Sequence, residues 1–353
     1  ETWMTKPVYE EGELPLALEG LTVLEFGQLV AAPLCGQMLG DMGANVIKVE
    51  RPKGGDLSRS LSLTSLKGES PVMLMFNRNK RSLAVDIRKP DGREIIHRLI
   101  PETDVIIQNF RPLVMERLGL DYGRISSLNP KLVYCSISGY GDSGPYIDKP
   151  GQDFILQGMS GVMWMNGYRG APPVPNANPI ADLSAGRLAA YGVLTALLAR
   201  DRFGYGQEVK VDLYSAMVET QVEQLFYHLN TDHPPTRGLP GHGAPSHPAP
   251  DGVYRTMDGM WITIVGNLPA TCSVLGLEDL SIDPRFQNWE NRRDNRDALR
   301  KILIKAVSKW KGKELLEQLE KAEVWCGPVN DYEDLVADPQ LAENQMLVEI
   351  GHS

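Results

Sequence analysis

Residues 21–50, LTVLEFGQLVAAPLCGQMLGDMGANVIKVE, decide the fold of this chain. The apolar run 21–26 is typical of a buried strand, and a turn follows it. Pro33 suits the first turn of a helix that Gly43 ends, and the apolar residues 45–49 predict a second strand. The stretch therefore predicts a compact strand–helix–strand unit with two parallel strands.

The same alternation continues along the chain. Further strands are predicted at 82–86, 104–108, 132–137 and 207–213, and helices at 92–99, 113–118, 182–202 and 215–229. Apolar strands that alternate with helices predict an α/β fold with an open parallel, Rossmann-like sheet. In such a sheet, ligands bind beyond the carboxyl ends of the strands, where the strand order switches.

A change of composition follows this sheet. Residues 231–250 are rich in Pro, Gly and His, which predicts a linker that doubles as an active-site loop. Asp258-Gly259 between two β-rich runs predicts a hairpin, and helices are expected at 294–310 and 313–322. The expected organisation is a large α/β domain over 1–230, the loop over 231–250, a smaller α+β domain over 251–328 and a return toward the large domain over 329–353.

Composition argues against several classes of protein. The 36 basic and 45 acidic residues give a net charge of −9, which disfavours nucleic acid and anionic membranes as partners. No apolar run is long enough to span a bilayer, and residues 1–20 lack the pattern of a secretory signal. Buried free thiols are expected, not a zinc site, at the widely spaced Cys35, Cys135, Cys272 and Cys326. A cytoplasmic location fits these features best.

Asp182 is the strongest candidate for chemistry. It stands at the head of a predicted helix, after the proline-rich stretch 172–179. Helix N–H groups would hold a carboxylate there, and the positive end of the helix dipole would keep it ionised near neutral pH. Such a carboxylate is a candidate nucleophile, although an ordinary N-cap aspartate has the same signature. Asp153 is interpreted as a supporting carboxylate.

Polar residues follow the predicted strands at the edge of the sheet where ligands bind. They include Gln28, Arg51 and 109–112, with Arg117 nearby. The planar fork of arginine grips phosphate oxygens, so a basic crevice is expected within an acidic chain. The alternative is that these cations are solvated surface residues.

Several short stretches occur in the same order as in a known family. They are 24–33, 43–50, 77–82, 109–112, 138–145, 204–207, 283–286 and 326–329. With them, nearly the whole chain resembles the class III CoA-transferases, the CaiB/BaiF family. This group contains formyl-CoA transferase and carnitine CoA-transferase, and α-methylacyl-CoA racemase is a relative.

The resemblance implies a CoA-transferase that uses coenzyme A as co-substrate, without a metal or a nucleotide redox cofactor. Asp182 matches the family's nucleophile, which forms an aspartyl anhydride and then an aspartyl-CoA thioester. The CoA-binding positions are matched by Gln28, Val30, Ala31, Arg51, Asn109, Phe110 and Arg117. The substrate pocket and its covering loop are matched by Gln152, Gly241, Gly243 and His247.

The partners that the resemblance implies are an acyl-CoA donor, a carboxylic acid acceptor and a second copy of the chain in an interlocked homodimer. In the family a C-terminal tail returns to the large domain, and this chain ends at Ser353, short of that tail. Val30 stands where formyl-CoA transferase has glutamine, which disfavours formate and oxalate as substrates.

Three alternatives share some of these features. A racemase needs a histidine where Gln152 stands and a glutamate where Arg255 stands, and neither residue can move the α-proton in the way required. A non-catalytic acyl-CoA-binding protein would keep the basic crevice without needing Asp182. A nicotinamide dehydrogenase would need G-x-G-x-x-G after the first strand, which residues 27–32 do not supply.

Overall fold

The computed structural model describes residues 15–61 and 64–351. Residues 1–14, which belong to the segment expected to lack a secretory signal, lie outside the described residues. The chain divides into two compact units. The first holds the described residues up to Met163 together with Pro175–Val222, and the second holds Trp164–Val174 and the described residues from Glu223 onward.

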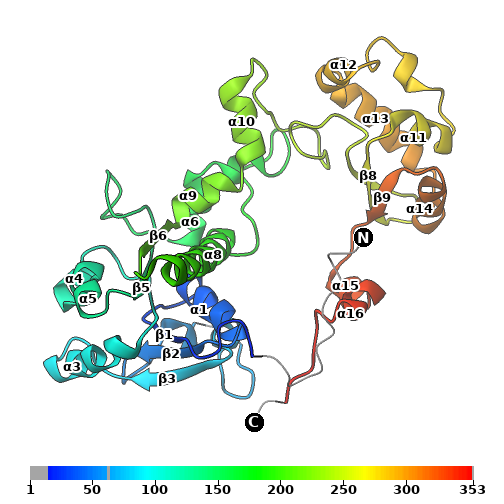
Figure 1. The fold of residues 1–353 in the computed structure, drawn as a ribbon. Coiled ribbons are helices and arrows are strands. Elements are labelled where there is room, and N and C mark those ends of the chain that lie inside the picture. The colour runs from blue at the N-terminus through cyan, green and yellow to red at the C-terminus, as the bar shows by residue number, and fades with distance from the viewer. Residues whose placement is uncertain (1–14, 62–63, 352–353) are drawn as a thin grey trace. The chain divides into compact units, whose positions relative to one another are not determined.

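A six-stranded parallel sheet forms the centre of the first unit (Figure 1). Its strands are β1 (Thr22–Glu25), β2 (Asn45–Glu50), β3 (Lys80–Ala84), β4 (Val105–Gln108), β5 (Val133–Ser138) and β6 (Glu208–Asp212). The order β3-β2-β1-β4-β5-β6 reverses between β1 and β4, and Val23 of β1 lies opposite both Val46 and Val105. The predicted open parallel sheet is confirmed, and the ends of β1 and β4 flank its switch point.

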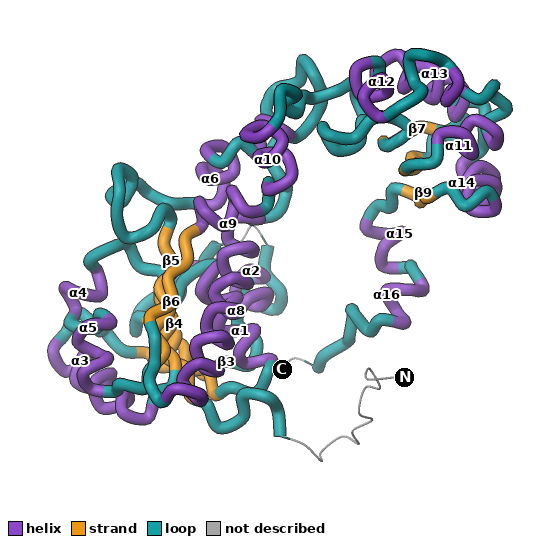
Figure 2. The backbone as a smooth tube through the Cα atoms, turned by 45° about the horizontal axis from the view of Figure 1, so that its top comes forward, coloured by secondary structure: helices purple, strands orange, loops and turns teal. Residues whose placement is uncertain are grey.

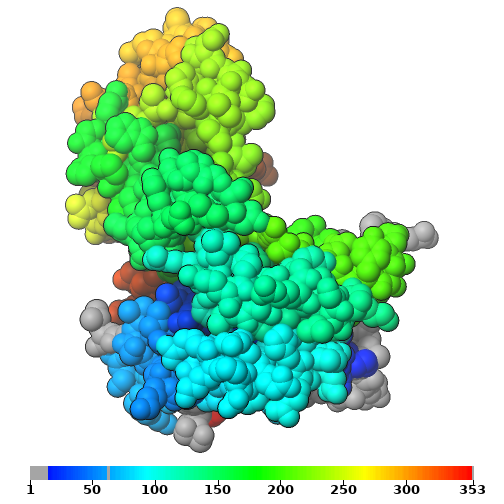
Figure 3. Space-filling view, turned by 90° about the vertical axis from the view of Figure 1, so that its left-hand side faces the viewer, coloured from blue at the N-terminus to red at the C-terminus, as the bar shows by residue number. Residues whose placement is uncertain are grey.

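Helices cover both faces of this sheet (Figure 2). One face packs against α1 (Ala31–Asp41), α6 (Asp153–Met159), α8 (Ile180–Phe203) and α9 (Leu213–Glu219). The other packs against α3 (Pro90–Leu99), η2 (Ile100–Glu102), α4 (Val114–Leu118) and α5 (Tyr122–Leu128). Figure 3 shows this second layer from outside, as a cyan surface. The segment between β2 and β3 carries η1 (Leu57–Arg59) and α2 (Pro71–Phe76).

Alternate residues of the strands serve the two layers. Val23 and Val105 belong to the core cluster beside α8, whereas Leu24 and Ile106 belong to the cluster beside α3. All four are fully buried, and each such side chain stabilises the fold by about 1.5 to 3 kcal/mol. This two-sided burial is why the strands are continuous apolar runs in the sequence.

Glycine lets α8 approach the start of α1. A Cβ at Gly186 would lie 2.7 Å from the carbonyl oxygen of Ala31. Only a residue without a side chain allows this approach. Because Asp182 lies one turn earlier on α8, the contact brings Asp182 toward the loop after β1.

Some element boundaries differ from the sequence prediction. Strand β3 begins at Lys80, two residues before the predicted start. The single helix predicted over 215–229 was wrong, because α9 ends at Glu219 and α10 (Val222–Asn230) begins after a break. The side-chain amide of Gln221 in this break donates to the carbonyl oxygen of Ser160 at 2.8 Å.

The second unit contains a three-stranded antiparallel sheet of β7 (Gly252–Arg255), β8 (Trp261–Val265) and β9 (Trp325–Pro328). The predicted hairpin is confirmed by the pairing of β7 with β8. Strand β9 was not predicted, because the sequence around Gly327 lacks a strand signal. The helices are α7 (Val162–Met165, at the boundary between the units), α11 (Leu268–Val274), η3 (Leu280–Ile282), α12 (Trp289–Asp294), α13 (Arg296–Val307), α14 (Gly312–Lys321), α15 (Tyr332–Val336) and α16 (Pro339–Glu343).

The helix expected over 294–310 is confirmed as α13, with narrower bounds, and α12, which ends at Asp294, was not predicted. In the part of the chain that the structure describes, no helix combines the length and the apolar character needed to cross a bilayer.

Four charged side chains are buried between β1, β2 and β3. The Nζ of Lys48 lies 2.7 Å from Glu25 Oε1 and 2.7 Å from Asp56 Oδ2, and the Nζ of Lys80 lies 2.7 Å from Glu25 Oε2. Burial lowers the pKa of Lys80 to about 8, although the charge of Glu25 opposes this. Burial acts in the same direction on Lys48, but the charges of Glu25 and Asp56 outweigh it and raise the pKa of Lys48. Two ammonium groups therefore balance two carboxylates, as buried charge requires.

Glu50, at the end of β2, holds the segment that follows it. Its carboxylate accepts hydrogen bonds from Arg59 Nε and Nη2 at 2.6 and 2.7 Å, from Ser82 Oγ at 2.9 Å and from Asp56 N at 3.0 Å. Burial favours the protonated form of Glu50, but the bonds from Arg59, Asp56 and Ser82 outweigh burial and lower the pKa of Glu50 to about 2.

We expect Glu50→Gln to lower the free energy of unfolding at pH 7 by on the order of 2 kcal/mol. A carboxylate with a depressed pKa stabilises the fold above its unfolded value of about 4.5 and loses that contribution as the pH falls toward 2. The difference from wild type should therefore shrink between pH 7 and pH 3, as measured by urea denaturation. Glu94→Gln, an exposed site on α3, is the control, and equal stability of Glu50→Gln and wild type at pH 7 would contradict the expectation.

Candidate functional site

A cavity of about 450 Å³ lies in the first unit, beyond the ends of β1, β4 and β5. Six of the residues predicted from the sequence line its wall: Gln28, Ala31, Asn109, Phe110, Gln152 and Asp182. The fold thus brings together residues that are up to 154 positions apart in the chain, from 28 to 182. Val30 is partly buried and precedes α1, but it is not part of this wall.

Asp182 lies in the first turn of α8, whose N-cap residue is Pro179. The N–H groups of Ala181 and Asp182 both donate to Oδ1 of Asp153, at 2.7 and 3.3 Å. The prediction that helix N–H groups hold the Asp182 carboxylate was therefore wrong, because Asp153 from α6 occupies that position. Within the described residues, no hydrogen-bond donor contacts the carboxylate of Asp182.

Asp153 and Gln157 together fix the loop that leads into α8. Asp153 is 8% exposed, and its Oδ2 accepts a hydrogen bond from Gln157 Nε2 at 2.7 Å. The same amide nitrogen donates to Asn178 O at 3.2 Å, and Gln157 Oε1 accepts from Asn176 N at 2.9 Å. The interpretation of Asp153 as a supporting carboxylate agrees with these contacts.

The environment of Asp182 makes it an unusually basic carboxylate. Burial raises its pKa to about 7, and the negative charge of Asp153 adds to the effect. Asp182 was expected to stay ionised near neutral pH, but burial and the charge of Asp153 favour its protonated form, because Asp153 takes the favourable helix position. With a pKa of about 7, both the protonated and the ionised forms of Asp182 are populated near neutral pH. The ionised form is weakly solvated and more basic than an exposed aspartate, which strengthens it as a nucleophile.

The turn between β1 and α1 is held against the end of β4. Gln28 N donates to Asn109 Oδ1 at 2.9 Å, and Asn109 Nδ2 donates to Gln28 O at 2.9 Å. Leu29, the next residue, has a φ of 68° and lies in the left-handed region. Asn109 therefore acts on the backbone of the turn, while Gln28, Leu29 and Asn109 all face the cavity.

Two cations, Arg111 and Lys149, also line the cavity. Arg111 follows β4, and Lys149 precedes Gln152, with its Nζ 4.0 Å from the ring centroid of Tyr146. Sequence reasoning placed Arg111 in the basic crevice but missed Lys149. The only available signal for Lys149 was its place three residues before Gln152.

A smaller, mostly apolar cavity of about 180 Å³ adjoins the same turn. It shares Gln28 and Phe110 with the first cavity and is also lined by Arg51, Val85 and Ile87. The guanidinium of Arg51 is exposed and donates to Gly55 O at 3.1 and 3.2 Å. Arg117 is exposed, donates to Leu113 O at 3.1 Å and lines neither cavity.

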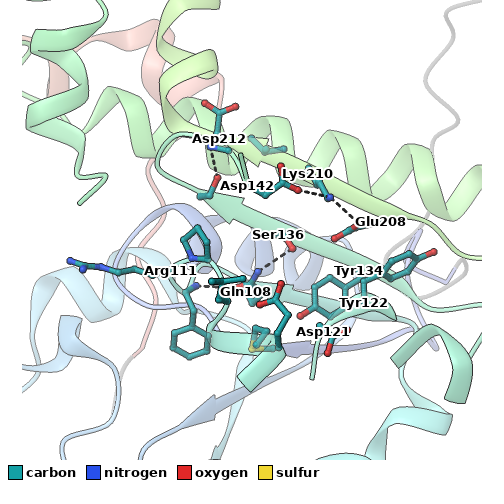
Figure 4. Close-up of a pocket in the computed structure, with 18 residues that line it drawn as sticks. Gln108, Arg111, Asp121, Tyr122, Tyr134, Ser136, Asp142, Glu208, Lys210 and Asp212 are labelled. Atoms are coloured by element: carbon teal, nitrogen blue, oxygen red, sulfur yellow. Dashed lines mark hydrogen bonds and ion pairs between the residues drawn. The ribbon is translucent and has the colours of Figure 1, made fainter. Parts of the chain in front are cut away.

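A third hollow, of about 310 Å³, lies beyond β4, β5 and β6 (Figure 4). It is rich in carboxylates, and Lys210 is paired there with Asp142 at 2.6 Å. Gln108 connects this hollow to the first cavity, because its Oε1 accepts a hydrogen bond from Phe110 N at 2.8 Å and its Nε2 donates to Ser136 Oγ at 3.0 Å. Gln108 thus fixes the backbone of Phe110, which lines all three spaces.

The predicted loop residues Gly241, Gly243 and His247 lie in the second unit. Gly241 has a φ of 73°, and a Cβ there would lie 2.5 Å from Arg300 Nη2. Gly243 N donates to Asp251 O at 3.0 Å, and His247 lies 3.1 Å from Asp251 Oδ2. The contacts of these three residues therefore hold the loop against other residues of the second unit.

We expect Asp182→Asn to raise the free energy of unfolding at pH 8 by on the order of 2 kcal/mol. A carboxyl group whose pKa folding raises from 3.8 to about 7 destabilises the native state progressively between these values. The gain should be fully present above pH 7 and should vanish below pH 4, as measured by urea denaturation at pH 8 and pH 3.5. Asp201→Asn, an exposed site near the other end of α8, is the control, and a destabilised Asp182→Asn at pH 8 would refute the expectation.

Comparison with known proteins places this chain in a family. A model of CoA-transferase family III matches residues 18–353. The chain is 35% identical to the succinate–glutarate CoA-transferase of Agrobacterium fabrum, over 94% of this chain and 85% of that protein. It is 32% identical to the succinyl-CoA–D-citramalate CoA-transferase of Chloroflexus aurantiacus, over 95% of this chain and 83% of that protein.

Solved structures agree with the sequence matches. A CaiB/BaiF family protein from Brucella suis is 35% identical, with a TM-score of 0.81, and 94% of this chain and 89% of that chain are covered. Rv3272 from Mycobacterium tuberculosis is 32% identical, with a TM-score of 0.84, and the coverage is 96% and 91%. The chain belongs to CoA-transferase family III and is a CoA-transferase that uses CoA thioesters as co-substrates.

Proposed function

We propose that the chain moves CoA from an acyl-CoA thioester to a small carboxylic acid, with Asp182 as the nucleophile. The observation that carries this proposal is the place of Asp182 on the wall of the 450 Å³ cavity, with a pKa near 7 and with Arg111 and Lys149 on the same wall. A basic carboxylate in a partly desolvated, cationic cavity is suited to attack a thioester carbonyl.

The reaction proceeds through exchanges at carbonyl carbons. An Oδ of Asp182 attacks the donor thioester, the C–S bond breaks, and CoA thiolate leaves a mixed anhydride on Asp182. The thiolate attacks the carboxyl carbon of Asp182, releases the donor acid and forms an aspartyl-CoA thioester. The acceptor carboxylate then attacks this thioester, and the expelled thiolate attacks the acceptor acyl carbon. The product acyl-CoA leaves, and the Asp182 carboxylate is restored without a net change in protons or electrons.

CoA is proposed to lie across the two adjoining cavities. Its base fits the apolar 180 Å³ cavity between Val85, Ile87 and Phe110, with Arg51 at hand for the phosphates. The pantetheine arm passes the turn of Gln28 and Ala31 and brings the thioester to Asp182. Asn109 supports this turn from the β4 side, and the exposed Arg117 is free to reach an outer phosphate.

Dicarboxylic acids are the proposed substrates. Relatives are named for succinate, glutarate and D-citramalate, which all carry two carboxylates. In the cavity of this chain, Arg111 and Lys149 offer two cations to a carboxylate remote from the reacting one, and Gln152 offers an amide.

The remaining parts of the family pattern are also proposals for this chain. The loop that carries Gly241, Gly243 and His247 would cover the anhydride and keep water from it. The domain boundaries at 230, 250 and 328 and the return of 329–353 belong to the same proposal, as do an interlocked homodimer and a cytoplasmic location. Their support is the motif pattern and the family membership.

We expect Asp182→Asn to abolish CoA transfer, by at least about 1,000-fold, while the affinity for CoA changes little. The measurements are a transfer assay with succinyl-CoA and a panel of dicarboxylates, and calorimetry with CoA. Mass spectrometry of wild-type protein with succinyl-CoA should show a covalent CoA adduct on Asp182. Retained transfer by Asp182→Asn would reject the nucleophile, and CoA binding without any transfer by wild type would favour a binding protein.

Isotope exchange distinguishes the proposed CoA transfer from the racemase alternative. Incubation of wild type with a 2-methylacyl-CoA in D₂O should leave the α-proton in place, because Gln152 cannot accept a proton. Deuterium incorporation faster than CoA transfer would overturn the proposed reaction class.

We expect Arg51→Ala to raise KM for the acyl-CoA by about 10-fold and to affect KM more than kcat, because a phosphate contact is present in both the ground and transition states. The raised KM should be accompanied by a weaker dependence of CoA affinity on salt. Arg98→Ala, an exposed cation on α3, is the matched control. An unchanged KM in Arg51→Ala would show that Arg51 does not contact the phosphates of CoA.

A further inference from the structure

We infer that the buried pair Lys48–Asp56 positions the reaction, by holding the turn of residues 27–30 in the shape that the catalytic cavity needs. This inference rests on the proposed function. Lys48 and Asp56 are positioning residues, because their charged groups form hydrogen bonds with the backbone of the turn.

The ammonium group of Lys48 contacts three oxygen atoms. Its side chain is almost completely buried, and its Nζ lies 2.7 Å from Glu25 Oε1, 2.7 Å from Asp56 Oδ2 and 2.9 Å from Gly27 O. The contacts with Glu25 and Gly27 are hydrogen bonds, and the contact with Asp56 is an ion pair. One of the three is the carbonyl group at the start of the turn, and another is the carboxylate that holds the middle of the turn.

Asp56 joins the turn to the segment after β2. Its Oδ1 accepts hydrogen bonds from Leu29 N at 3.1 Å and from Ser58 N at 2.8 Å. Its own N–H donates to Glu50 Oε2 at 3.0 Å, which fixes its backbone. The positive charge of Lys48 and these hydrogen bonds outweigh burial and hold the pKa of Asp56 below its usual range. The carboxylate therefore remains ionised and paired.

The clamped residue is in an unfavourable backbone conformation. Leu29 has a φ of 68°, in the left-handed region that a side chain with a Cβ rarely adopts. Such a conformation persists where the surrounding contacts over-determine it. Here Lys48 acts on Gly27, Asn109 acts on Gln28 and Asp56 acts on Leu29, so three consecutive residues are each held by a different side chain.

The position of this turn affects the chemistry directly. Gln28, Leu29 and Ala31 line the same cavity as Asp182, so the turn forms part of the wall of the proposed active site. A displacement of about 1 Å between reacting groups costs about 100-fold in rate. A loosened turn should therefore lower kcat more than it weakens the binding of acyl-CoA.

The test is a double-mutant cycle of Asp56→Asn and Lys48→Met, read as kcat and KM in the transfer assay. Each single variant leaves one buried charge without its partner. In Asp56→Asn, the side-chain amide has only one oxygen, so its NH₂ group must face either the ammonium group of Lys48 or the N–H of Leu29, which are both donors. We expect each folded single variant to lose about 10- to 100-fold in kcat, with KM for acyl-CoA within about 3-fold of wild type. The double variant restores charge balance, because Glu25 still pairs with Lys80. Without the ammonium group of Lys48, the side-chain oxygen of Asn at position 56 can accept the hydrogen bond from Leu29 N. Its kcat should exceed that of both single variants.

Asp41→Asn is the matched control, because it also removes a carboxylate from a pair in the same unit, the exposed pair with Arg78. Single variants that fold and keep kcat within about 2-fold of wild type would overturn the inference. A double variant whose loss equals the product of the two single losses would also overturn it, because the pair would then not act as a unit.

A second comparison avoids the buried charges, for the case in which the single variants do not fold. Leu29→Gly keeps the N–H and favours a positive φ, whereas Leu29→Pro removes the N–H and imposes a negative φ. We expect kcat of Leu29→Gly to exceed that of Leu29→Pro by at least about 10-fold, and equal values would reject the inference. If wild type transfers no CoA at all, the proposed function itself has failed; a wild-type rate that is insensitive to these changes rejects the positioning role alone.

Discussion

The burial of Lys48 is the constraint on which the site depends. A buried ammonium group is tolerated only when all of its hydrogens are bonded and its charge is balanced. Glu25 and the carbonyl oxygen of Gly27 accept hydrogen bonds from Lys48 Nζ, and the carboxylate of Asp56 pairs with its charge at 2.7 Å. The end of β1, the turn after it and the segment after β2 are thus tied at one atom. The contacts of Lys48 Nζ restrict the conformation of these segments, so the crevice at the switch point has a defined shape.

Two carboxylates at the start of α8 have opposite environments. Asp153 accepts hydrogen bonds from the N–H groups of the first turn and from the side-chain amide of Gln157. Asp182 faces the cavity, and burial and the charge of Asp153 raise its pKa. The helix dipole therefore serves the supporting residue, and the neighbouring residue is left basic. Environments that separate two nearby carboxyl groups in this way are a general means of assigning them different roles.

The sequence predicts those features that depend on local pattern. Residues 21–50 specify a strand, a helix and a strand through periodicity and turn residues, and the structure has all three. The cap of α8 could not be predicted, because Asp153 lies 28 residues before the N–H of Ala181. Strand β9 was missed for the same reason, since it exists through pairing with β8, 64 residues away at Thr263 and Gly327. The placement of Asp182 at a helix start was predicted, but its pKa followed from contacts that no local pattern records.

The proposed mechanism also explains how a carboxylate enzyme can bind a carboxylate acceptor. An ionised Asp182 repels a second anion in a cavity of about 450 Å³. When Asp182 becomes an aspartyl-CoA thioester, its charge disappears, and Arg111 and Lys149 remain on the wall. The cavity is then electrostatically favourable for the acceptor at the stage where the acceptor must attack. Formation of the aspartyl-CoA thioester thus activates the carboxyl carbon of Asp182 and removes its negative charge, so the order of binding follows from charge.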